Sequence, residues 1–197
     1  MLKNIKQELN PWTGEIKSSF TVENIPVTVS TFCHQKEDVI SVQVSSPLIA
    51  LKRLQIFIRF PYPTGDWADV GINYNSKEKH QSKIISQTNK SASILHQLDT
   101  TKYYVDLLWK DAAKITSSNQ HEFLIEPKNK GNDFECSFRF SSIKTAQPVP
   151  SYVQTKGESK WAWKNFWSRG GAIDFSGSTD ERAFELERRI VLSQYLT

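Results

Sequence analysis

The sequence predicts a mainly β protein in which antiparallel strands form a β-sandwich. Short segments rich in β-branched and aromatic residues follow one another from Ile16 to Phe140. Clusters of Asn, Lys, Ser, Gly and Asp separate these segments, and apolar residues do not recur within them at helical spacing. About eight or more such strands favour an antiparallel sandwich, and 197 residues are enough to bury a large core.

The first two strands are expected to pair as a hairpin. Ser18–Val22 and Ile25–Phe32 are rich in β-branched residues, and Glu23 and Asn24 lie between them as the turn. The next segment, Val39–Val44, repeats the period of two that is typical of a strand with one buried face.

The clearest predicted strand is Leu54–Phe60, which ends where Pro61 and Pro63 interrupt any further pairing. Its apolar positions would share one face of the strand: Leu54, Ile56, Ile58 and Phe60. Five more strands are expected at Ser82–Thr88, Ser91–Leu98, Tyr103–Trp109, His121–Glu126 and Phe134–Phe140.

The pattern changes after the last strand. Two prolines within 146–151 favour a linker. The aromatic segment Glu158–Ser168 is expected to be a helix that ends at Gly170 and Gly171. A final amphipathic helix should open at Ser178, since Ser178 and Glu181 fit a capping box.

Three regions follow from this reading: a sandwich domain over 1–145, a linker with an aromatic helix over 146–177, and a single helix over 178–197. On the last helix, Glu185 and Arg189 should form an ion pair one turn apart. No helix stop signal follows Val191, so we expect this chain to be part of a longer polypeptide whose next helices cover the apolar stripe.

Composition argues against several functional classes. The net charge of +4 is spread along the chain without a basic block, so we expect no nucleic-acid partner. No apolar segment is long enough for a membrane span, and no secretory signal is readable, which leaves the compartment open. Cys33 and Cys136 form no metal-binding motif, and we expect two buried free thiols, with a disulfide as the alternative. The four histidines are isolated in sequence, so we expect no metal and no cofactor.

Candidate substrate-binding residues lie in two loops. Asp66 and Asp69 flank Trp67, which places an aromatic ring beside two carboxyl groups, although a solvated loop with one buried tryptophan explains the same residues. Asp174 has no evident local structural role. The candidate substrate-binding residues are therefore Trp67, Asp69 and Asp174.

Two groups of motifs resemble a known family. The junction motif is Trp161-x-Trp163-x-x-Phe166-Trp167, followed by 170–180 and 185–197. Upstream are Pro11-Trp12-Thr13-Gly14-Glu15-Ile16 and Phe60-Pro61-Tyr62-Pro63-Thr64-Gly65. Together they resemble the six-hairpin glycosidase-like proteins related to glycoside hydrolase family 65.

The resemblance implies a galactose-mutarotase-like β-supersandwich, then a linker helix and the first helix of an (α/α)6 barrel. It implies that catalytic residues lie on later barrel helices, so no residue of this chain is expected to be catalytic. The chain would support a glycosidase or phosphorylase and contribute loops to the rim of its sugar site, with the barrel and a carbohydrate as partners. The alternative is a stand-alone module that binds proteins or carbohydrates, the latter through Trp12, Trp67 or Trp109.

Overall fold

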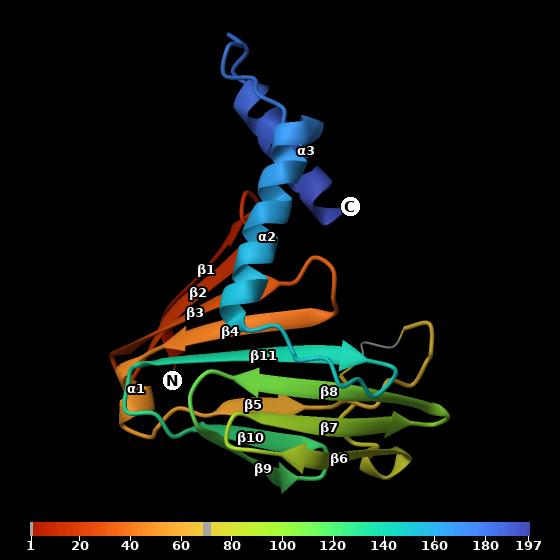
Figure 1. The fold of residues 1–197 in the computed structure, drawn as a ribbon. Coiled ribbons are helices and arrows are strands. Elements are labelled where there is room, and N and C mark those ends of the chain that lie inside the picture. The colour runs from red at the N-terminus through yellow and green to blue at the C-terminus, as the bar shows by residue number, and fades with distance from the viewer. Residues whose placement is uncertain (1, 69–71) are drawn as a thin grey trace.

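The computed structural model describes residues 2–68 and 72–197, and its strands form two antiparallel sheets (Figure 1). The large sheet has the order β1-β2-β3-β4-β11-β8-β7-β6. Its strands are β1 Leu2–Asn10, β2 Glu15–Val22, β3 Ile25–Cys33, β4 Val39–Ser45, β6 His80–Gln87, β7 Ser91–Leu98, β8 Thr101–Trp109 and β11 Asp133–Ser141. The small sheet has the order β5-β10-β9, with β5 Ile56–Arg59, β9 Ala113–Asn119 and β10 Glu122–Pro127.

The predicted sandwich is confirmed: the small sheet faces one part of the large sheet, and the hydrophobic core lies between them. Phe134, Leu107 and Ile94 reach this core from the large sheet, and Phe123 and Ile125 reach it from the small one. A short helix, α1 Pro47–Ala50, closes one end of the core with Leu48 and Ile49, and Ser46 caps it.

Most strands lie where the alternation of residues places them. Glu23 and Asn24 both have positive φ, as the tight turn of the β2–β3 hairpin requires. The predicted apolar face of the fifth segment is confirmed, because its four residues all pack on the core: Leu54, Ile56, Ile58 and Phe60.

Two strands have no counterpart in the sequence prediction. Strand β1 is exposed along its whole length, so it lacks the alternation by which a buried face is recognised. It belongs to the sheet only through its pairing with β2. Strand β9 is short and becomes polar after Ile115, and its pairing with β10 keeps it in the small sheet.

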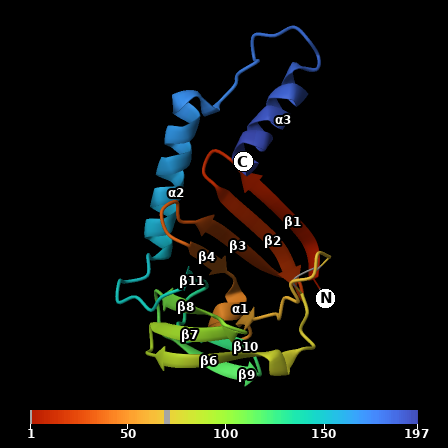
Figure 2. The same ribbon diagram turned by 90° about the vertical axis from the view of Figure 1, so that its right-hand side faces the viewer.

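Two long helices and two irregular turns complete the chain. They are α2 Tyr152–Phe166, the π-helical turn η2 Trp167–Gly171, α3 Ala183–Leu196 and the 3-10 turn η1 Lys77–Lys79. Figure 2 shows α2 standing against the large sheet near β3 and β4, with α3 returning beside it from the far end. No helix within the described residues is long and apolar enough to cross a membrane.

Both predicted helix starts are wrong. Helix α2 begins before residue 158, because Ser151 and Gln154 form the capping box: the Ser151 hydroxyl accepts from the Gln154 N–H, and the Gln154 side chain accepts from the Ser151 N–H. Ser178 and Glu181 cap no helix. Helix α3 starts at Ala183, and Asp180 instead pairs with Arg182.

Small hydroxyl side chains hold α2 against the outer face of the large sheet. Ser41 donates a hydrogen bond to Thr155, 2.9 Å away, and its oxygen lies 2.7 Å from the Ser137 hydroxyl. The hydroxyls of Ser30 and Tyr152 are 3.0 Å apart. All five side chains are buried, so the polar groups of this helix–sheet contact satisfy one another.

Candidate functional site

Two of the motifs that carry the family resemblance, Pro11–Ile16 and Trp161–Trp167, pack against each other in the structure. Trp167 donates a hydrogen bond from Nε1 to the Pro11 carbonyl, 2.8 Å away, and its ring centroid lies 5.3 Å from that of Trp12. Ser159 donates to the Thr13 carbonyl at 2.9 Å. The end of α2 is therefore fixed to the β1–β2 turn rather than to the face of the sheet.

Gly14 lets the helix approach this turn closely. Its φ is +69°, a conformation that side chains with a Cβ rarely adopt. A Cβ at this position would lie 2.4 Å from Nε1 of Trp163 and 2.7 Å from Oγ of Ser159. The turn therefore needs glycine for both its backbone conformation and the space that Trp163 occupies.

Aromatic rings continue from this turn toward α3. Trp163 stacks on Trp167, with centroids 5.9 Å apart, and on Tyr195 of α3 at 4.4 Å. Trp163 and Trp167 lie one turn apart on the same face. We call Trp12, Trp163, Trp167 and Tyr195 the junction cluster. A groove beside it is lined by Trp12, Thr13, Lys160, Lys164, Trp167 and Ser168.

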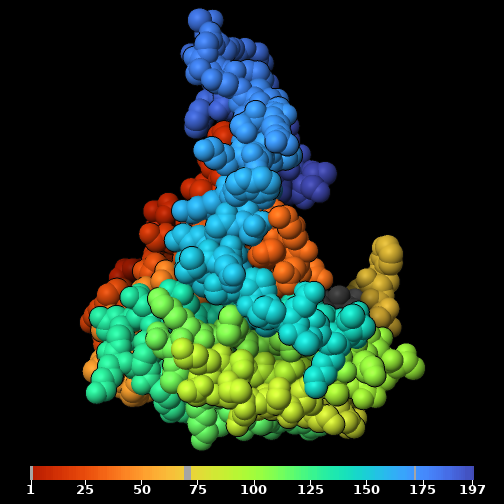
Figure 3. Space-filling view, in the orientation of Figure 1, coloured from red at the N-terminus to blue at the C-terminus, as the bar shows by residue number. Residues whose placement is uncertain are grey.

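The candidate residues from the sequence do not form a common site among the described residues. Trp67 is fully exposed, so the interpretation that it is buried in its loop is wrong. Figure 3 shows this loop as a yellow projection that stands apart from the helices. Asp69 lies outside the described residues. Asp174 is exposed, and hydrogen bonds from the Ser176 hydroxyl and N–H lower its pKa, which gives it the local turn role it lacked in the sequence.

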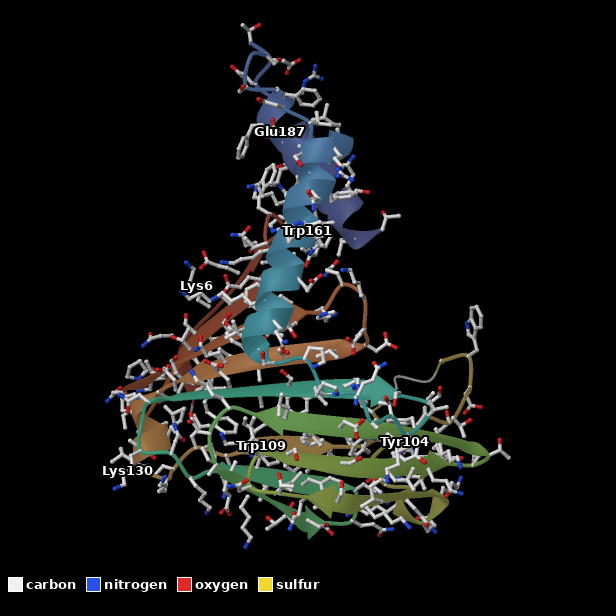
Figure 4. All side chains as sticks on the ribbon, viewed as in Figure 1. Lys6, Tyr104, Trp109, Lys130, Trp161 and Glu187 are labelled. Atoms are coloured by element: carbon white, nitrogen blue, oxygen red, sulfur yellow. The ribbon has the colours of Figure 1, made fainter. Side chains whose placement is uncertain are left out.

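Burial distinguishes Trp109 from Trp161, and Cys136 from Cys33. Trp109 is 1% exposed and donates to the Asn89 carbonyl, so its assignment as a possible sugar platform is wrong. In Figure 4 Trp109 lies among the strands, whereas Trp161 lies on α2. Both cysteines are free thiols, as expected, but only Cys136 is buried and Cys33 is exposed.

The fold brings three histidines together that are isolated in sequence. His80, His96 and His121 are buried, and one ring nitrogen from each lies within 4.8 Å of the others. Antiparallel pairing places His96 directly opposite Ser82 on β6, and the β9–β10 turn adds His121. The sequence offered one usable signal: His96 lies in a predicted strand whose other buried positions are apolar or small.

Hydrogen bonds define the tautomers in this histidine cluster. A carbonyl can only accept, so Nε2 of His121 donates to the Lys77 carbonyl at 2.8 Å and Nδ1 carries the lone pair of the neutral ring. Ser82 lies 2.9 Å from that Nδ1 and 2.7 Å from Nδ1 of His96. Because the hydroxyl has one hydrogen, it donates to His121 and accepts from His96.

Burial favours the neutral form of His80 and His96. Loss of water lowers the pKa of His96 to about 4, and its two histidine neighbours lower it further. The pKa of His80 is also lowered, first by burial and then by His121.

We expect Gly14→Ala to destabilise the chain and Gly157→Ala to stabilise it slightly. The first change strains the backbone, at a cost of about 1–2 kcal/mol, and forces Trp163 aside. The second replaces a helical glycine that has no atom within 4 Å of its Cβ position, which should contribute up to about 1 kcal/mol. Urea unfolding followed by tryptophan fluorescence measures both. Equal stability of the two variants would contradict the role of Gly14.

Stability should fall as the pH decreases from 6.5 toward 4. The unfolded chain binds a proton at His96 near its ordinary pKa of 6.5, whereas the folded chain resists protonation until about pH 4. The stabilisation is therefore fully present above pH 6.5, and about 3 kcal/mol of it is lost at pH 4. Urea unfolding across this range tests the effect. His96→Phe lacks the titrating group, so its loss of stability between pH 6.5 and 4 should be smaller by about 3 kcal/mol. An unchanged loss of stability would refute the assignment of the pH dependence to His96.

Comparison with known proteins finds solved structures that match this chain, one of which is described below. No family model matches the sequence, and no curated protein matches it. The similar structure is described as "Putative kojibiose phosphorylase from human microbiome"; it is 12% identical, with a TM-score of 0.44. The alignment covers 100% of this chain and 24% of that chain. This chain therefore spans about a quarter of the length of the protein it matches.

Proposed function

We propose that this chain is the β-sandwich and linker portion of a carbohydrate-active enzyme that acts on glycosidic bonds. In this proposal the sandwich supports a catalytic helical barrel and contributes loops to the rim of the sugar site. The observation that carries the proposal is the junction cluster. Segments around Trp12 and Trp167, which resemble the same family at separate places in the sequence, hold one another through a hydrogen bond and ring contacts.

Helix α3 offers the surface on which such a barrel would pack. None of its side chains is buried, and its exposed apolar residues are Phe184, Leu186 and Leu196. Helices in proteins gain most of their stability from packing an apolar face rather than from propensity. Glu185 forms the predicted ion pair with Arg189 on the polar side, which leaves the apolar side for a partner.

The proposal places the chemistry outside this chain. The carboxylates near the junction are engaged locally: Asp180 pairs with Arg182, and Glu187 accepts from the Phe175 N–H. Hydrolysis by paired carboxyl groups needs two of them facing a shared space about 5 to 9.5 Å across. In this proposal the residues of the barrel determine whether water or phosphate accepts the glycosyl group.

Expression of the native reading frame, including any codons that follow Thr197, tests the main proposal. We expect the product to cleave disaccharides of glucose, and assays with and without inorganic phosphate distinguish phosphorolysis from hydrolysis. Trp167→Ala should lower this activity because it loosens the junction cluster. Trp161→Ala, at an exposed position on the same helix, should not. Cleavage by residues 1–197 alone, or a product that acts on no glycoside, would refute the proposal.

A second candidate function is sugar binding by the chain itself, and the exposure of Trp67 favours it. Aromatic rings that project into solvent can stack on the C–H faces of sugars. Titration of residues 1–197 with oligosaccharides, followed by tryptophan fluorescence, tests this function. A response that is lost in Trp67→Ala and kept in Trp161→Ala would support it, and no response at millimolar sugar would reject it.

A further inference from the structure

The histidine cluster has the donor atoms of a metal site. Neutral imidazole is a preferred ligand of zinc, copper and nickel. His80, His96 and His121 each offer one ring nitrogen within 4.8 Å of the others.

An unpartnered atom points to a missing ligand. Nδ1 of His80 is buried and has no hydrogen-bond partner among the described residues, and His80 as a whole is 4% exposed. A buried polar atom left without a partner costs about 1–3 kcal/mol. By contrast, His96 and His121 each have a hydrogen bond at one or both ring nitrogens, to Ser82 or to the Lys77 carbonyl.

The outer contacts of His121 and His96 match those of metal ligands. A histidine that binds a metal through one nitrogen usually donates the other N–H to a carbonyl or another acceptor, which fixes the tautomer. His121 donates Nε2–H to the Lys77 carbonyl, and the hydrogen-bond assignment makes His96 donate Nδ1–H to Ser82. Glu78, beside the cluster, acts electrostatically on His80 and favours positive charge there.

We propose that His80, His96 and His121 bind one divalent transition metal ion, of the class represented by Zn²⁺. Three imidazoles leave a fourth position for water or for the Ser82 hydroxyl. The ion would join β6 and β7 of the large sheet to the β9–β10 turn of the small sheet, so its role is to clamp the two layers of the sandwich. This site is independent of the proposed action on sugars.

Binding requires one ring to turn. The rings of His80 and His121 stack with centroids 3.6 Å apart and 14° between their planes. A metal lies in the plane of the imidazole that binds it, and one ion cannot lie in two parallel planes. His121 keeps its Nε2 hydrogen bond to the Lys77 carbonyl, and the ion replaces the Ser82 hydroxyl hydrogen at Nδ1, whereas a turn of His80 breaks no hydrogen bond at Nδ1. His80 is therefore the ligand that moves, bringing the nitrogens toward the separation of about 3.4 Å that a tetrahedral zinc requires.

Metal titration of the 197-residue chain tests the proposal. The chain is refolded from urea with a chelator, transferred to chelator-free buffer at neutral pH, and titrated with Zn²⁺ by calorimetry. We expect one ion per chain, and a melting temperature higher by about 5 to 10 °C at a free zinc concentration of 100 times Kd. Co²⁺ should give the visible absorption of a tetrahedral site. The absence of both the calorimetric signal and the thermal shift would overturn the proposal.

Two matched variants locate the ion. His80→Gln removes the ligand whose Nδ1 makes no hydrogen bond, so the metal-free chain should still fold, and its affinity for Zn²⁺ should fall at least about tenfold. His34→Gln changes a half-buried histidine outside the cluster and should leave binding unchanged. Binding that depends on His34 instead would place the ion away from the cluster and overturn the site.

A spectroscopic readout covers the case in which His80→Gln does not fold. In the parent chain, long-range ¹H–¹⁵N spectra of the imidazoles report each ring nitrogen separately. Zn²⁺ should move one nitrogen in each of His80, His96 and His121. Spectra in which these three rings keep their metal-free shifts while zinc binds would refute the assignment.

Discussion

The position of the helical region depends on the contact between α2 and the large sheet. This contact combines small hydroxyl side chains, among them Ser41, Ser137 and Thr155, with the ring of Phe32 packed against Tyr152. Small side chains let the helix lie close, and their mutual hydrogen bonds offset the cost of burying them. Because α2 is one continuous helix of about four turns, fixing its first half also fixes the direction in which its second half leaves the sandwich.

A buried arginine secures the segment that leads into this helix. Arg139 on β11 pairs with Asp106 at 3.0 Å and donates to the carbonyls of Gln147 and Pro148. The segment 146–151 therefore does not act as a free linker, since side-chain hydrogen bonds tie it to the sheet. At the other end of α2, Trp167 reaches the β1–β2 turn. The helix is thus held at both ends, and the exposed strand β1 gains a contact that its own side chains do not provide.

The histidine cluster shows how antiparallel pairing creates a site from residues that have no motif in common. His80 and His96 are brought together by the register of β6 and β7, and His121 arrives from a different sheet through a turn with positive φ. Register depends on the whole set of strand pairs, so the spacing of these residues in the sequence carries no signal. The spacing of Trp12 and Trp167 in the sequence likewise carries no signal of their contact, which joins the β1–β2 turn to the end of α2.

The sequence by itself determined most of the strands, the core face of β5, the β2–β3 turn and the ion pair on α3, because each depends on neighbours along one strand or helix turn. Tertiary structure decided what long-range packing controls: that β1 pairs although it is exposed, that Trp109 is buried while Trp67 is not, and that three histidines meet. The start of α2 lies between these cases. Its capping box is local, yet prolines before Ser151 and Gly157 within the helix obscured it, and only packing of the first turns on the sheet made the earlier start favourable.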